Sequence, residues 1–356
     1  MRTWRALAAT TATVVAATAS VGPALADVGC FDRKTQPYTS VVDSHLHLRP
    51  FGGPGIPLAE MGDYWIQTGV RFVNVYGIGQ ILPVDSACTY YLDCLGTPVL
   101  PSPKNDVENA SDVAQTSIDG VQLTLSMTFP DLANPAGILD EMRRLDSAYP
   151  GRFTWMGEVN LIKQALWNNG AQPAGLEDIV SWWPFMAELR RRDMPITIHS
   201  DLGNDAEPLK YLYLMEAALN LYPDNKIVWP HMGLSNELMT MDPALHIDTL
   251  RRLMDQHPKL YLDISWRILE DLYFSHESIR NQYVPFLDQY SSRIIPGTDF
   301  VAARKKDFSV YADELDVTSR INNYLSDNAF RDIALGQSYF DLLGLPDQAP
   351  PICVAR

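Results

Sequence analysis

The chain has 356 residues, 46% of them hydrophobic, and a formal net charge of −15 at pH 7. This length suits one α/β barrel with a large core, because such barrels often exceed about 250 residues. The 43 acidic residues outnumber the 28 Lys and Arg, and no basic stripe is present, so nucleic acid is not an expected partner.

Residues 1–26 have the pattern of an export signal. Arg2 and Arg5 give a positive start, residues 6–21 are small and apolar, and Ala24-Leu25-Ala26 is a small-x-small cleavage motif. We therefore expect residues 27–356 to form a mature protein that is secreted or held in the periplasm or cell envelope. The alternatives are an uncleaved membrane anchor and a lipid anchor at Cys30. No later segment is long and apolar enough to span a bilayer.

Four cysteines in an exported chain predict disulfide bonds. Cys88 and Cys94 are close enough in sequence to close a short loop, and Cys30 and Cys353 would join the two ends of the chain. A metal site built from cysteines is the alternative, but the sequence has no C-x-x-C pair.

Eight short runs of β-branched and aromatic residues alternate with longer amphipathic stretches. The predicted strands cover residues 39–48, 70–76, 121–127, 153–161, 195–200, 227–231, 260–265 and 294–300. The predicted helices cover residues 58–67, 137–149, 176–192, 208–221, 244–257 and 278–290, followed by a helical region at 311–345. These units predict a single-domain α/β fold, a (β/α)8 TIM barrel. An open doubly wound sheet is the alternative, although no glycine-rich phosphate motif supports it.

Two features of this pattern carry further predictions. Residues 80–120 form a long segment with prolines and two cysteines after the second strand. Loops that follow barrel strands project from the face that holds active sites, so we predict that this segment is a partial lid. Trp182 and Trp183 fall within the helix at 176–192, and both are predicted to pack in the core or against a neighbouring helix rather than to form a stacking platform.

Four of the seven histidines lie at the ends of predicted strands. His45 and His47 are two residues apart on the first strand and therefore point to one side. His199 ends the fifth strand and His231 ends the sixth. An isolated H-x-H pair is often incidental, but core packing does not explain four imidazoles at one barrel mouth, because buried imidazoles need partners. Metal ligation explains all four. The remaining histidines fall in or beside helices and are predicted to be exposed: His246, His257 and His276.

Two carboxylates complete the predicted site. Glu158 lies on the fourth strand and Asp299 at the end of the eighth. Lone acids at strand ends are usually helix caps or solvated loop residues, but these two lie in largely apolar runs. A bound cation would neutralise them. Asp299 is also a candidate general base for metal-bound water.

With these residues the sequence resembles the amidohydrolase superfamily, and within it the amidohydrolase-related family of (β/α)8 metal enzymes. The resemblance spans residues 40–346 and rests on Asp43-Ser44-His45-Leu46-His47, His199, His231 and Gly297-Thr298-Asp299. Glu158 in Gly-Glu-Val-Asn-Leu is similar to the strand-four motif of TatD-like hydrolases, and residues 334–345 look like the family's closing helix. Phe300-Val301-Ala302 departs from the proline that usually follows the strand-eight motif, and the long second loop has no match, which leaves the substrate open.

The resemblance implies that His45, His47 and Asp299 bind the more buried metal, that His199 and His231 bind a second, and that Glu158 bridges them. We therefore expect a hydrolase that attacks an ester, lactone or amide bond of a small molecule with metal-activated hydroxide. Asp299 would move the proton, and one or two divalent ions, in the first place Zn²⁺, would be bound.

Two alternatives remain at this point. One is a metal-dependent decarboxylase of an aromatic or unsaturated carboxylic acid, and a bridging Glu158 argues against it because it implies two metals. The other is a non-catalytic metal-binding or carbohydrate-binding module. For substrate contacts, Trp266, Arg267 and residues 304–306 follow strands seven and eight and could hold an anion, although an ordinary polar helix start is the simpler interpretation. The oligomeric state stays open.

Overall fold

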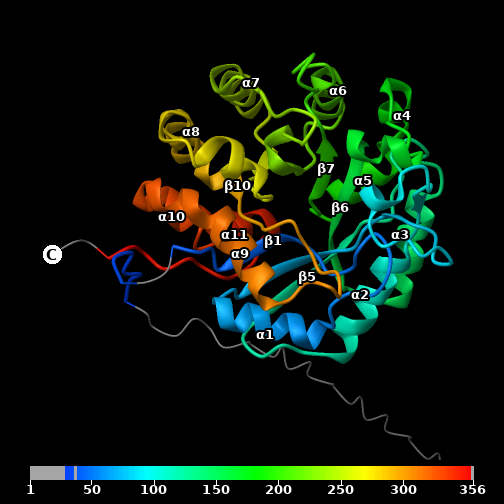
Figure 1. The fold of residues 1–356 in the computed structure, drawn as a ribbon, viewed down its shortest axis with the longest axis horizontal. Coiled ribbons are helices and arrows are strands. Elements are labelled where there is room, and N and C mark those ends of the chain that lie inside the picture. The colour runs from blue at the N-terminus through cyan, green and yellow to red at the C-terminus, as the bar shows by residue number, and fades with distance from the viewer. Residues whose placement is uncertain (1–28, 36–37, 354–356) are drawn as a thin grey trace, which may run out of the picture.

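The strands form a closed parallel ring (Figure 1). This computed structural model describes residues 29–35 and 38–353, so the predicted export signal lies outside them. The strand order is β10-β9-β8-β7-β6-β5-β2-β1-β11. The bounds are β1 (Val42–His47), β2 (Phe72–Tyr76), β5 (Gln122–Met127), β6 (Phe153–Ile162), β7 (Ile196–Ser200), β8 (Ile227–Trp229), β9 (Leu260–Asp263), β10 (Ile294–Ile295) and β11 (Phe300–Val301).

One chain segment closes this ring. Its first part, β10, pairs with β9, and its second part, β11, pairs with β1. Both pairings are parallel, so residues 294–301 act together as the eighth barrel strand. The predicted (β/α)8 TIM barrel is therefore confirmed.

Helices surround the ring of strands (Figure 1). Their bounds are α1 (Leu58–Thr68), α2 (Lys104–Gln115), α3 (Ile138–Ala148), α4 (Leu176–Ser181), α5 (Trp183–Arg191), α6 (Leu212–Leu221), α7 (Pro243–Gln256), α8 (Glu277–Tyr290), α9 (Phe308–Ser319), α10 (Asp327–Ile333) and α11 (Gln337–Leu343). None of the helices in the described ranges has the length and apolar composition needed to cross a bilayer.

The helix predicted at residues 176–192 is in fact two helices, α4 and α5. They meet at Trp182, and Pro184 lies in the first turn of α5, where a proline is tolerated. Trp182 is fully buried as predicted, but the prediction for Trp183 is wrong, because 66% of its surface is exposed. Neighbouring residues on a helix point in different directions, so both indoles do not face the core.

Two histidines that we predicted to be exposed are buried. His246 contacts the Tyr283 hydroxyl through Nδ1 at 2.7 Å and the Met232 carbonyl through Nε2 at 2.9 Å. His257 is 8% exposed at the end of α7, whereas His276 is exposed as predicted. These helical histidines are buried because a helix turns part of its surface to the barrel, and polar partners satisfy the His246 ring there.

The segment at residues 80–120 is only partly a loop, because its last third contains α2. This helix buries Asn105, Asp106 and Asn109 together with Ala110, so most of its buried residues are polar. Asp106 fixes the helix to the end of β5 by accepting hydrogen bonds from the backbone amides of Thr128 and Phe129, both at 2.9 Å. The second barrel unit therefore has its expected helix.

The rest of this segment, residues 80–101, is a long loop whose two ends lie side by side; we call it the excursion. β3 (Gln80–Ile81) pairs antiparallel with β4 (Leu100–Pro101). Between them the Cys88–Cys94 disulfide closes a short loop with a Cα separation of 6.0 Å. A small apolar cluster separate from the main core anchors the excursion: Phe51, Ile78, Ile81, Leu82, Val99 and Leu166.

The first and last described segments of the chain run side by side, blue against red in Figure 1. The Phe31 amide donates to the Pro351 carbonyl at 2.7 Å, and the Cys353 amide donates to the Phe31 carbonyl at 2.9 Å. The Cys30–Cys353 disulfide joins them with a Cα separation of 4.9 Å. Both predicted disulfide pairs are thus present.

Replacing Cys30 and Cys353 together by serine should lower the free energy of unfolding by about 2–5 kcal/mol, because the bond restricts the unfolded chain over a sequence separation of 323 residues. Urea unfolding of both proteins would measure this. The Cys88–Cys94 disulfide closes a sequence separation of only 6 residues, so replacing both of its cysteines by serine should lower the free energy of unfolding by less. An equal or larger loss in that second variant would contradict the prediction.

Candidate metal centre

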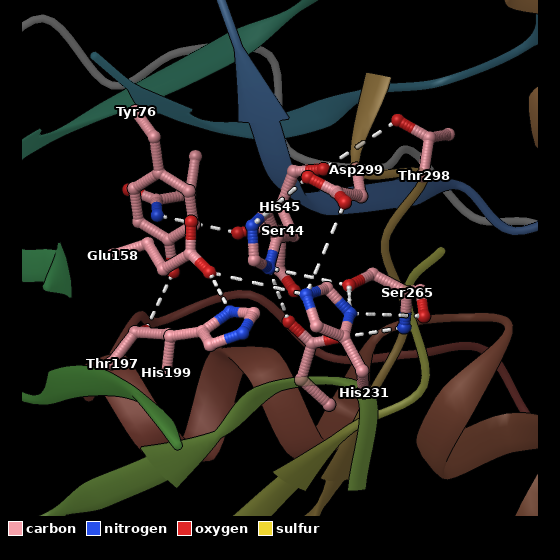
Figure 2. Close-up of polar contacts among 12 residues, drawn as sticks. Ser44, His45, Tyr76, Glu158, Thr197, His199, His231, Ser265, Thr298 and Asp299 are labelled. Atoms are coloured by element: carbon pink, nitrogen blue, oxygen red, sulfur yellow. Dashed lines mark hydrogen bonds and ion pairs between the residues drawn. The ribbon is translucent and has the colours of Figure 1, made fainter. Parts of the chain in front are cut away.

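All six predicted site residues meet at the carboxyl ends of the barrel strands. Figure 2 shows five of them together: His45, Glu158, His199, His231 and Asp299. The side chains come from five places in the ring: His45 and His47 on β1, Glu158 on β6, His199 on β7, His231 directly after β8, and Asp299 directly before β11. Glu158, His45, His47, His199 and His231 are buried, and the Asp299 side chain is 19% exposed. The prediction that strand ends bring these residues together is borne out.

The potential ligand atoms lie within a few ångströms of one another. His47 Nε2 is 3.2 Å from both His45 Nε2 and Asp299 Oδ1, and 3.5 Å from Glu158 Oε2. On the other side His199 Nδ1 contacts Glu158 Oε1, and His231 Nε2 lies 3.9 Å from the same oxygen. The two oxygens of Glu158 therefore face different halves of the site.

Three overlapping groups within the described chain place nitrogen and oxygen donors within 4.8 Å of one another. They are His45, His231 and Asp299; His45, His47 and Glu158; and Glu158, His199 and His231. Imidazole nitrogens with carboxylate oxygens are donors that suit Zn²⁺ and similar divalent ions. The donor set therefore fits the expected metal.

Each of the four imidazoles has its outward nitrogen held by another group. His45 Nδ1 lies 2.6 Å from Asp263, and His47 Nδ1 donates to the Gly77 carbonyl at 2.6 Å. His199 Nε2 contacts Asp201 at 2.9 Å, and His231 Nδ1 lies 3.3 Å from the Ser265 carbonyl. Such partners fix each ring and direct its inner nitrogen toward the centre of the site, as is typical of ligating histidines.

Asp299 is positioned by the first strand. Thr298 donates from its backbone amide and its hydroxyl to the buried Asp43 carboxylate, both at 2.9 Å. The Asp299 amide donates to the His45 carbonyl at 2.8 Å. Gly297 permits this close approach, because a Cβ there would lie 2.6 Å from His45 Cβ.

Three residues at the barrel mouth have left-handed backbone conformations. The φ angles are 55° at Asp299, 56° at His231 and 69° at Trp266. Non-glycine residues rarely adopt such angles, and when they do the surrounding structure holds them in place, often at functional sites. Two of the three are candidate ligands, so the fold stabilises an unfavourable backbone where the chemistry is expected.

The electrostatics keep the two carboxylates ionised. Burial raises the pKa of Glu158, but the Lys163 ammonium and His199 together lower it by more. The pKa of Glu158 therefore lies well below its ordinary value. Burial likewise raises the pKa of Asp299, but the hydrogen bond from His47 and the charge interactions with His45 and His231 together lower it by more. Burial lowers the pKa of His231 to about 4, which leaves this imidazole neutral with a free lone pair. Ionised carboxylates beside a neutral imidazole are ready to bind a cation.

Three residues of the site were missed in the sequence. Lys163 directly follows β6, and its Nζ lies 3.1 Å from both Glu158 oxygens. Asp201 and Asp263 hold the outward nitrogens of His199 and His45. Both acids lie at or just after the end of a strand, and that position was a usable signal. Lys163 had no such signal in the sequence, because its separation of five residues from Glu158 matches no strand periodicity.

A cavity of about 710 Å³ opens above these residues. Tyr90 and Tyr91 of the excursion line it together with Phe51 and Trp266, so the excursion forms part of the cavity wall, and its role as a partial lid stays a prediction. Four basic side chains also line the cavity, although a polar helix start was the simpler interpretation of their positions in the sequence: Arg267, Arg304, Lys305 and Lys306.

These four cations are not equally available. Arg267 is paired with Asp271, Asp313 and Glu314, and Arg304 is paired with Glu60. Lys305 and Lys306 instead lie over the rings of Tyr90 and Phe300, at 6.0 and 4.7 Å from the ring centres. The two lysines are therefore better placed than the two arginines to bind an anionic group.

Comparison with known proteins matches the sequence to one family and the structure to one fold. The sequence model described as amidohydrolase matches residues 107–334. A search of the curated proteins finds no match. Similar solved structures include a dihydroorotase from Campylobacter jejuni, with 13% identity, a TM-score of 0.52, and coverage of 86% of this chain and 84% of that one.

Two further structures have the same fold. A Burkholderia multivorans amidohydrolase with bound zinc is 13% identical, with a TM-score of 0.52 and coverage of 86% of this chain and 99% of the other. An Agrobacterium tumefaciens protein is 14% identical, with a TM-score of 0.53 and coverage of 89% and 97%. At these identities the likeness establishes the barrel fold alone.

Proposed function

The chain belongs to the amidohydrolase family of metal-dependent hydrolases, and from that premise we propose that it cleaves an ester, lactone or amide bond of a small-molecule substrate. The observation that carries this proposal is the orientation of the four histidines. Every outward ring nitrogen has a partner, and the inner nitrogens surround the carboxylates of Glu158 and Asp299. Such an arrangement is suited to holding a cation beside a substrate cavity.

The six proposed ligands are His45, His47, Glu158, His199, His231 and Asp299. One or two divalent cations held among them, in the first place Zn²⁺, would act as a Lewis acid that lowers the pKa of bound water from 15.7 to about 7 and polarises the scissile carbonyl. The zinc in the Burkholderia neighbour supports this choice of metal.

The residues of the chain divide the remaining tasks. Asp299 is the more exposed of the two carboxylates, at 19% against 4% for Glu158, so it reaches the cavity and accepts the proton of the attacking water. Glu158 lies between His47 and His199 and holds these two ligands in position. Tyr91 and Phe51 exclude bulk water from the cavity, which strengthens the electrostatic interactions inside it.

A decarboxylase of an aromatic or unsaturated acid is the second candidate, and one observation favours it. Lys305 and Lys306 face the cavity and would hold a carboxylate. The two reactions differ in their products. Metal-loaded protein should therefore be assayed against esters and lactones by proton release at constant pH, against amides by release of the amine, and against aromatic acids by release of carbon dioxide. We expect proton or amine release from the first two panels, and carbon dioxide from the third would reverse the assignment.

The proposal includes export, with cleavage before Asp27 and one barrel domain over residues 27–356. The two disulfides support it, because such bonds persist in oxidising compartments. Intact mass of the protein from the extracellular or periplasmic fraction would test this. A mass that still includes residues 1–26 would contradict the cleavage.

A further inference from the structure

A lysine ammonium lies inside the candidate metal centre. Lys163 Nζ is 3.1 Å from Glu158 Oε1, 3.1 Å from Glu158 Oε2 and 3.5 Å from His199 Nδ1. The side chain is only 17% exposed, and its residue lines the cavity. One ammonium therefore contacts two of the three members of the group formed by Glu158, His199 and His231.

The two halves of the centre differ in what already fills them. Glu158 Oε1 contacts Lys163 and His199, and it is also the oxygen nearest to His231 Nε2, at 3.9 Å. The opposite half, formed by His45, His47 and Asp299, receives no contact from a lysine or arginine side chain within the described residues. The inner nitrogens of His45 and His47 therefore meet no competing lysine, whereas His199 Nδ1 already contacts the ammonium.

Local repulsion points in the same direction. The Lys163 ammonium already pairs with Glu158 in the half of the centre that contains His199. A second divalent ion placed in that half would lie next to the ammonium in a buried site, where like charges repel strongly.

We propose that Lys163 serves as the internal cation of this centre and limits the protein to one tightly held divalent ion, bound by His45, His47 and Asp299. This inference rests on the proposed metal-dependent function. Lys163 is a positioning residue that holds Glu158 between His199 and the ion. It follows that a single bound metal does not by itself indicate a decarboxylase, because the lysine supplies the second positive charge.

The test is the number of metal equivalents bound, which needs no substrate. Wild-type protein and the Lys163→Met variant are loaded with Zn²⁺, dialysed and analysed for metal per chain. We expect about one equivalent in the wild type and about two in the variant, because removal of the ammonium frees Glu158 Oε1 and His199 Nδ1. Lys305→Met, which removes another cavity lysine, is the matched control and should keep about one equivalent.

The wild-type protein also provides a test that does not depend on a variant that folds. Titration with Co²⁺, followed by its visible absorption, should saturate at about one equivalent. Saturation at two equivalents would overturn the inference, and so would a folded Lys163→Met variant that still binds one. Binding of no metal by the wild type would instead overturn the proposed metal centre, and the inference with it.

Discussion

Replacing Asp299 by asparagine should lower kcat by about three orders of magnitude while most of the metal stays bound. The amide keeps the shape of the side chain and an oxygen that can ligate, but it no longer accepts a proton. Asp299 Oδ1 lies 3.2 Å from His47 Nε2, and its side chain reaches the cavity. Steady-state kinetics and metal analysis of the same preparation would separate loss of chemistry from loss of metal.

The matched control for this variant is Glu314→Gln. Glu314 also lines the cavity, but its carboxylate contacts Arg267 at 3.2 Å rather than the histidines. Its replacement should change kcat by less than roughly tenfold, as expected for a group outside the proton transfer. If Asp299→Asn retains more than about a tenth of wild-type kcat, Asp299 is not the proton acceptor.

The second large effect is expected from an acid that does not itself ligate. Asp263→Ala should weaken Zn²⁺ binding about 10- to 100-fold, because Asp263 holds His45 Nδ1 at 2.6 Å and so aims Nε2 inward. Without this carboxylate, the Ser265 hydroxyl at 3.2 Å is the remaining side-chain partner of His45 Nδ1 in the described chain, and a hydroxyl fixes the tautomer less strongly than a carboxylate does. Competition with a chromophoric chelator would measure the dissociation constant of the metal.

Asp106→Ala is the control for a general loss of stability. Asp106 is equally buried, but it bonds to Thr128 and Phe129 rather than to a histidine. Its removal should lower the melting temperature and leave metal affinity nearly unchanged, since it leaves buried amides unsatisfied away from the ligands. An unchanged affinity in Asp263→Ala would show that His45 needs no such support.

Much of the barrel could be predicted from the sequence because its strands are buried on both faces and appear as continuous apolar runs. All eight predicted runs contain an observed strand, including the eighth, which is divided between β10 and β11. The helix α2 could not be predicted in this way. Three of its four buried residues are polar, Asn105, Asp106 and Asn109, so it does not appear as a stretch of large apolar residues.

The candidate ligands were predictable because parallel strands end at one face, so that residues far apart in sequence share a location. Their orientation was not predictable, because it depends on tertiary partners such as Asp263 for His45. Lys163 shows the same limit more sharply. Its contact with Glu158 depends on the path of the chain directly after β6, and no local pattern specifies that path.

The residues that surround the substrate cavity depend on loops and could only be suggested. Tyr90 and Tyr91 reach the site because the excursion after β2 folds back over the barrel and is closed by the Cys88–Cys94 disulfide. Lys305 and Lys306 reach it because the chain turns between β11 and α9 at the mouth. Such placement requires the three-dimensional structure.

The central claim, that these strand-end side chains hold a divalent metal, is tested most directly by the metal content of the purified protein. Elemental analysis of the wild type after dialysis should give about one equivalent of a divalent metal per chain. The His45→Ala/His47→Ala double variant, if it is folded by circular dichroism, should retain less than about a tenth of that amount. A metal-free wild type, or a double variant that retains the full wild-type content, would contradict the claim.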